Sequence, residues 1–196
     1  VKNILNRQYY NGEDINYTYR NPNNSEISSN PTVTISGVSL NETSKMAIQG
    51  VKWYLGGISY YVSYYTAAQD YQQERSKTGG AGNPTLTEWV GNVGLIYPSD
   101  YGYALSLQEC GSSPMLGATD NCKYTNWLFD KKDNKEWVIT PSSSYENSVI
   151  SITNGWVNYS NTHSKQNIRP TVYLKPNISI IDGDGTSSNP YELSLN

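Results

Sequence analysis

The spacing of apolar residues predicts helices in the first half of the chain. After Asn41, which is a good helix N-cap, apolar side chains recur every three or four residues at Ile48, Val51 and Leu55. These positions share one face of a helix that we expect to end at Gly56-Gly57. A second helix is predicted over residues 66–77, followed by a glycine-rich loop.

Alternation of apolar and polar residues predicts strands, most of them in the second half. Residues 149–152 and 156–159 flank Asn154-Gly155, and Asn-Gly between two such segments is the strongest short signal for a hairpin. Further strands are predicted at 32–40, 92–97, 126–129, 136–140, 169–174, 178–181 and 191–195. Helices early and strands late indicate an α+β domain with two helices on a twisted antiparallel sheet.

Residues 1–31 are polar and rich in Asn, with turn chemistry at 21–25. We expect them to form an arm that lies on a single domain spanning residues 32–196. No apolar segment approaches the roughly 20 residues of a membrane-spanning helix. Because the chain opens with Val1, we expect either a processed product or an excised piece of a longer chain, with any membrane anchor upstream.

Composition and charge favour a secreted binding domain. The net charge is −3 and the 14 basic residues are dispersed, which argues against nucleic acid as a partner. Charged residues make up only 16% of the chain, below the roughly 25% of an average soluble domain. Tyr supplies 18 of the aromatic residues, and the polar remainder is mostly Asn and Ser, so we expect an uncharged polar surface and an extracellular location.

The scarcity of reactive side chains argues against an enzyme. A Ser-His-Asp triad would have to use His163, the only histidine. A zinc site would need His163, Cys110 and Cys122 to converge with a carboxylate. We therefore expect no catalytic residue, no metal and no cofactor.

Cys110 and Cys122 lie in a segment rich in Gly, Ser, Asn and Asp. A bond between them would close a loop of about a dozen residues, and a disulfide is expected in an oxidising compartment. The alternative is two unrelated thiols. The spacing is too long for a redox pair of the Cys-x-x-Cys type.

The acidic segment 182–185, Asp-Gly-Asp-Gly, has two interpretations. It lies between two predicted strands, so a turn that pairs them is the simpler one. Asp182 and Asp184 could instead bind calcium, although the downstream Glu of an EF-hand loop is missing.

Several motifs occur in an order that resembles a known group of proteins. They are Trp53-Tyr54-Leu55-Gly56-Gly57, Thr66-Ala67 with Tyr71 and Glu74-Arg75, residues 94–104, Asn126-Trp127-Leu128, Thr140-Pro141, residues 168–174 and residues 183–193. This order, over residues 45–196, resembles uncharacterised surface proteins of gut Firmicutes, many of them made as type IV prepilin-like precursors. The Arg-Pro strand near the end also resembles C-type-lectin-like domains, including those diversified by retroelements.

The resemblance implies a cell-surface location and a C-type-lectin-like architecture more than an activity. Two departures affect it. Asn167 stands where the family usually has Gly, and Asn tolerates the left-handed conformation better than most residues. The hydrophobic prepilin helix is missing from this sequence, so pilus assembly is implied by relatives alone.

Arg169 stands between Ile168 and Pro170 at the start of an apolar strand, so we expect it to be partly buried. A buried charge needs a partner, and Asp100 and Glu74 are the expected ones. An internal ion pair is the main interpretation, and a ligand-binding Arg is the alternative.

Residues 142–167 combine Tyr, Trp, Asn and Ser, the residue types that dominate antibody paratopes. The candidate ligand-binding residues are Tyr145, Trp156, Asn158, Tyr159, Asn161 and His163. The alternative is a solvated hairpin in which Trp156 belongs partly to the core and His163 is an ordinary exposed loop residue.

The sequence therefore favours a non-catalytic domain of the bacterial surface that adheres to or recognises a protein or glycan ligand. The main alternative is a pilin-type filament subunit that binds copies of itself through residues 1–31. An enzyme related to lectin-like oxidases is the weakest hypothesis, because that chemistry relies on reactive or metal-binding Cys.

Overall fold

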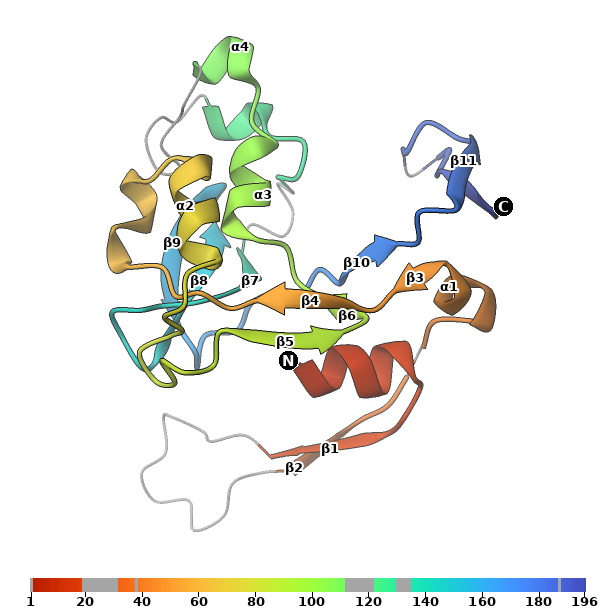
Figure 1. Cartoon of the computed structure of the whole chain (residues 1–196), viewed down its shortest axis with the longest axis horizontal. Helices are drawn as coiled ribbons and strands as arrows, with labels where there is room; N and C mark the ends of the chain where they lie inside the picture. Colours follow the sequence, from red (N-terminus) through yellow and green to blue (C-terminus); the bar gives the residue numbers. More distant parts are fainter. Residues whose placement is uncertain (1, 19–31, 38, 112–121, 130–134, 187) are drawn as a thin grey trace.

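A computed structural model of the chain describes residues 2–18, 32–37, 39–111, 122–129, 135–186 and 188–196. Helices and strands are mixed along it, which confirms the α+β class. The strands form small antiparallel sheets of two or three strands each, where one larger sheet was predicted (Figure 1).

The described part of the N-terminal arm packs on the rest of the chain. It consists of a π-helical segment, η1 (Ile4–Tyr10), and β1 (Ile15–Thr18), which pairs with β2 (Thr32–Ile35). Leu5 of η1 is buried against Val93 and Leu95. The Asn6 side chain donates to the carbonyl of Val93 at 2.8 Å and accepts from the Val93 amide at 3.1 Å. These contacts hold η1 beside β6 (Val93–Gly94).

The helix predicted to run from Asn41 to Leu55 is wrong in its second half. Asn41 does cap a helix, α1 (Glu42–Ala47), but β3 (Ile48–Gln49) and β4 (Val51–Tyr54) follow it directly. β4 pairs with β5 (Glu88–Gly91), and Trp53 is buried while its neighbours Lys52 and Tyr54 are exposed. Ile48, Val51 and Leu55 fit a helical period, whereas Val51, Trp53 and Leu55 fit a strand period. In the structure the strand forms, because it pairs with β5 and buries the Trp53 indole.

The second predicted helix is confirmed as α2 (Ala67–Glu74), although it is shorter than expected. Thr66 and Gln69 form a reciprocal capping box at its start. A 3₁₀ segment, η2 (Tyr60–Tyr64), precedes it. α2 packs against α3 (Pro98–Tyr103), a helix that the apolar spacing did not predict.

The best-predicted unit is the meander of β7 (Lys135–Pro141), β8 (Ser148–Thr153) and β9 (Trp156–Asn161). Asn154 and Gly155 join β8 to β9 with φ of 54° and 80°, so the predicted hairpin is confirmed. One face of this sheet forms the main core, which includes Ile58, Val62, Tyr101, Val138, Ile150 and Val157.

The last three strands follow the β7–β9 meander along the chain. β10 (Thr171–Leu174) lies between β3 and β6, and β11 (Ile178–Asp182) pairs with β12 (Glu192–Leu195) (Figure 1). The predicted turn between β11 and β12 is confirmed. Its carboxylates serve the turn itself, because Asp182 accepts from the Gly183 amide at 2.7 Å and Asp184 from the Thr186 amide at 2.9 Å.

Candidate functional site

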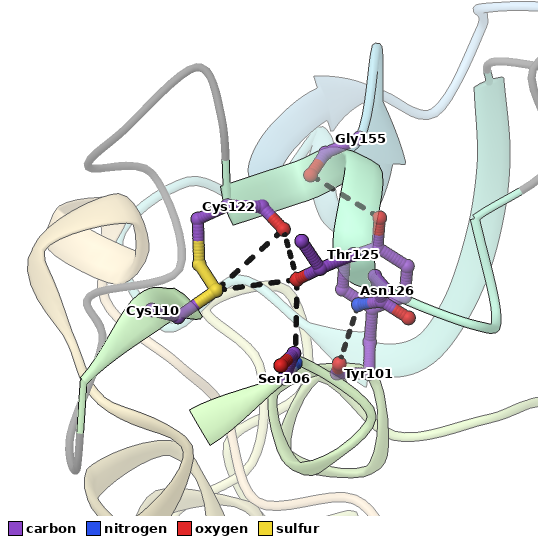
Figure 2. Close-up of a disulfide and its surroundings, with 7 residues drawn as sticks. All are labelled: Tyr101, Ser106, Cys110, Cys122, Thr125, Asn126 and Gly155. Carbon is purple, nitrogen blue, oxygen red and sulfur yellow. Dashed lines mark hydrogen bonds between the residues drawn. A yellow bond between two sulfur atoms is a disulfide. The ribbon is translucent and has the colours of Figure 1, made fainter. Parts of the chain in front are cut away.

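The predicted disulfide is confirmed, and it fixes one end of the candidate site. Cys110 ends α4 (Leu107–Cys110) and Cys122 begins η3 (Cys122–Thr125), as Figure 2 shows. The Thr125 hydroxyl donates to the carbonyl of Cys122 at 2.8 Å and accepts from the Ser106 amide at 3.3 Å. The disulfide and these bonds hold η3 against the segment that joins α3 to α4.

The turn that follows η3 displays a tryptophan. Asn126 is buried, and its amide donates to the carbonyl of Tyr101 at 2.8 Å (Figure 2). Its Oδ1 accepts from the Leu128 amide at 2.9 Å. Trp127 lies between these anchors and is 78% exposed. The strand predicted at 126–129 is therefore wrong, because the Asn126 side chain accepts a hydrogen bond from a backbone amide two residues on, which favours a turn.

Trp127 lines a groove of about 580 Å³, here called the Trp127 groove. α3 and the segment that enters β10 also line it. Tyr103 of α3 is 61% exposed and adds a second aromatic side chain. Asp100 and Arg169 line the same groove and give it one negative and one positive charge. The groove thus offers flat apolar faces beside charged hydrogen-bonding groups, which are the features of a site for a polar ligand.

Arg169 forms the expected internal ion pair, but with a different acid. Its Nη2 lies 2.8 Å from Oε2 of Glu136, and its Nη1 donates to the carbonyl of Leu128 at 2.9 Å. The prediction that Arg169 pairs with Asp100 and Glu74 is therefore wrong. Asn167 exchanges backbone bonds with β7 around Glu136, and this register brings Arg169 beside that carboxylate.

The fixed position of Arg169 matters for the groove. Glu136 is buried, whereas the Arg169 side chain is 34% exposed. A guanidinium carries five N–H donors in a planar fork, so the contacts to Glu136 and Leu128 orient it without using all of them. Asp100 is exposed as well, and its Oδ2 accepts from the Tyr97 amide at 3.2 Å at the start of α3.

Glu74, one of two buried acids on α2, holds the α3 wall in place. Glu74 of α2 accepts two bonds from Ser99 of α3, from the amide at 2.8 Å and from the hydroxyl at 2.6 Å, and pairs with Arg75 at 3.0 Å. Asp70 is fully buried one turn earlier, and neither of its oxygens accepts a hydrogen bond from a described residue. Burial raises the pKa of Asp70 to about 8 and that of Glu74 to about 7.

The structure divides the recognition face that the sequence predicted. Tyr145 and Tyr159 come together, with ring centroids 5.7 Å apart, and both are exposed. Trp156 and Asn158 alternate with Val157 and Tyr159 along β9, so they lie on the opposite face of the strand. Trp156 is half-buried, with the Lys123 ammonium 5.0 Å from its ring.

Of the last two predicted ligand residues, Asn161 ends β9 and His163 lies in the turn that follows. Asn161 uses its Oδ1 to accept from the His163 amide at 2.9 Å, and His163 is exposed. The six residues therefore do not form one surface, and none of them lines the Trp127 groove. Of the residues singled out from the sequence, Arg169 and Asp100 line it. Trp127 was noted only as part of a motif, because no sequence signal showed that its side chain points outward.

Within the described ranges, no helix has the length and apolar character needed to cross a membrane. The disulfide is compatible with an extracellular location. The chain was compared with protein-family models, curated proteins and solved structures, and nothing matched in any of the three comparisons.

Proposed function

We propose that this chain is an extracellular, non-catalytic domain that recognises a glycan or protein ligand in the Trp127 groove. The observation that carries the proposal is the display of Trp127, a largely exposed indole on a turn that the hydrogen bonds of the buried Asn126 side chain hold in place. Exposing a large aromatic side chain forfeits hydrophobic stabilisation, and Trp is the residue type most enriched at the centres of binding sites.

Rigidity supports the same proposal. The turn is fixed from one side by the disulfide and η3 and from the other by Asn126, and Arg169 is oriented by Glu136. A site that is ordered before binding loses less conformational entropy when the ligand arrives. The groove pairs two aromatic faces with one acid and one base, which suits the hydroxyl groups and ring faces of a sugar or the side chains of a protein loop.

The wider setting is also a proposal. The disulfide and the low content of charged residues support a location outside the cell. The motif order supports kinship with bacterial surface proteins that carry a C-type-lectin-like domain, and adhesion is the role such a domain would have. We propose a non-catalytic role because the sequence contains few His and Cys residues.

Labelled protein applied to arrays of glycans and of host surface proteins tests the proposal. We expect at least one class of ligand to bind, and Trp127→Ala to weaken that binding by tenfold or more. Tyr64→Ala is the matched control, because Tyr64 is a 67% exposed aromatic residue outside the groove. Binding that survives Trp127→Ala, or that Tyr64→Ala weakens equally, would refute a site in this groove.

The filament hypothesis stays a prediction. Leu5 and Ile15 are buried in their own chain and β1 pairs with β2, so this part of the arm would have to detach before it could add to a neighbour. Light scattering of the full chain and of a chain without residues 1–31 tests it. Oligomers that form only with the arm present would favour assembly, whereas monomers over a wide concentration range would exclude it.

A further inference from the structure

A second hollow is separate from the Trp127 groove. It lies on the face of the β7–β9 sheet that points away from the main core. Val138 faces the main core, so the alternation along β7 places Trp137 and Ile139 on the other face. There they meet Leu5 of η1 and Trp89 of β5 around a space of about 490 Å³. We call it the apolar groove, and its volume lies within the roughly 300–1,000 Å³ of small-molecule sites.

The apolar groove is elongated. A neighbouring hollow of about 240 Å³ continues it, because the two share Leu55, Leu86, Ile139 and Val149 as lining residues. The second hollow leads toward Tyr145 and Glu146. Leu86, on the shared wall, is 48% exposed, so the groove is open to solvent along its side. An open apolar channel of this kind fits a chain-like ligand better than a compact one.

The polar groups are unevenly distributed along this channel. Among the side chains that line the first hollow, only Lys2, Thr162 and the indole N–H groups of Trp89 and Trp137 can form hydrogen bonds. An extended peptide would bring backbone N–H and C=O groups that need hydrogen-bond partners, and this lining supplies few of them. A saturated alkyl chain needs none. The lining of the first hollow therefore favours a hydrocarbon over a peptide.

Lys2 gives the channel a positive end. Its ammonium lies 5.0 Å from the ring centroid of Trp89, and it forms no ion pair with an acidic side chain in the described part of the chain. The Asn6 bonds to Val93 hold η1, and with it Lys2, at the mouth of the groove. Glu146 lies at the far end, so an anionic head is attracted to the Lys2 end and repelled from the other.

We propose that the apolar groove binds a single-chain amphiphile with an anionic head, a free fatty-acid carboxylate, with the head at Lys2 and the alkyl chain running toward Leu86 and Val149. This site is separate from the Trp127 groove, and binding here does not require that the proposed recognition function be correct.

A chain-length series on the unmodified protein tests the alkyl part. Calorimetric titration with hexanoate, octanoate, decanoate and dodecanoate should show affinity rising up to about fourfold per added methylene, until the channel is full. Quenching of tryptophan fluorescence gives a second readout, because Trp89 and Trp137 line the site. An affinity that does not change with chain length would overturn the proposal.

Head-group variants test the role of Lys2. Dodecanoate should bind at least fivefold more tightly than dodecanol, and Lys2→Gln should abolish that preference. Lys77→Gln, which changes an exposed lysine outside the groove, should leave it intact. Equal binding of acid and alcohol, or tighter binding of dodecyltrimethylammonium, would refute an anionic head at Lys2. An apolar peptide that binds where dodecanoate does not would assign the groove to a peptide.

A charge in the wall locates the site. Leu86→Glu should weaken dodecanoate binding by tenfold or more, whereas Leu107→Glu, which alters an exposed leucine outside the groove, should not. Thermal melts of both variants establish that they fold. If both bind dodecanoate like the unmodified protein, the ligand lies elsewhere and the proposal fails, while array binding through Trp127 would still stand.

Discussion

Replacing Asp70 with Asn should change how the stability of the fold depends on pH. Asp70 is fully buried in α2, and neither carboxylate oxygen accepts a hydrogen bond from a described residue. Burial, with a further contribution from the nearby Glu74, raises the pKa of Asp70 to about 8. The folded protein therefore keeps Asp70 neutral at pH 7, where an unfolded chain ionises it, since an unperturbed Asp has a pKa near 3.9.

The sign and the size follow from proton counting. Below about pH 4 both states hold the proton, so the full stability is present. Between about pH 4 and pH 8 only the folded state holds it, and the free energy of unfolding falls by about 1.4 kcal/mol per pH unit for this one group. Glu74, whose pKa is raised to about 7 by burial, adds a similar loss up to that pH.

Asp70→Asn removes the contribution of Asp70 to the pH dependence of the free energy of unfolding. At pH 5 the variant should be less stable by about 1–3 kcal/mol, because the new amide donors are buried without partners. Between pH 5 and pH 7 the difference should move by about 2.7 kcal/mol in favour of the variant, so that the two stabilities become similar or cross. Urea unfolding at pH 5, 6 and 7, followed by tryptophan fluorescence, to which the buried Trp53 contributes, measures both curves.

Asp184→Asn is the matched control. Asp184 is exposed, and the hydrogen bond from the Thr186 amide lowers its pKa, so it is ionised in both states above pH 5. Its replacement should shift stability equally at every pH tested. Parallel curves for Asp70→Asn and the unmodified protein would show that Asp70 is already ionised in the fold, and the argument from burial would be wrong.

Three further changes test individual contacts. Replacing both Cys110 and Cys122 with Ser should lower the free energy of unfolding by about 3 kcal/mol on the chain-entropy model, measured by urea unfolding. Arg169→Met should destabilise by about 1–3 kcal/mol, and adding Glu136→Gln should recover part of the loss, since the buried carboxylate is then neutral; a double-mutant cycle checks this. Gly56→Ala should lower the melting temperature or prevent folding, because a Cβ there would collide with carbonyl oxygens at the end of α2.

The sequence predicts those parts of the fold whose cause is local. The Asn154-Gly155 hairpin forms as expected because both residues adopt positive φ, which that turn requires and few other residues tolerate. The cap at Thr66 is local in the same sense. In each case the residues that decide the structure are within a few positions of it.

Prediction fails where the cause is a distant contact. The spacing of residues 48–54 is compatible with a helix or a strand. Pairing with β5 and burial of Trp53 favour the strand. The partner of Arg169 depended on the register between residue 167 and β7, which no spacing in the sequence reveals. The candidate site depends on both kinds of information, and for that reason the sequence named Arg169 but missed the display of Trp127.

The abundance of Asn has a structural role that composition alone did not indicate. We interpreted it as a solvated surface, yet Asn6 and Asn126 place their side chains on backbone groups of distant segments. Small separate sheets leave more backbone groups without a strand neighbour than one continuous sheet would, and those groups must find other partners. An amide side chain can donate and accept at once, so one Asn can satisfy two such groups. The same side chains hold Lys2 at the mouth of the apolar groove and Trp127 at the other groove, and the polar composition therefore positions both candidate sites.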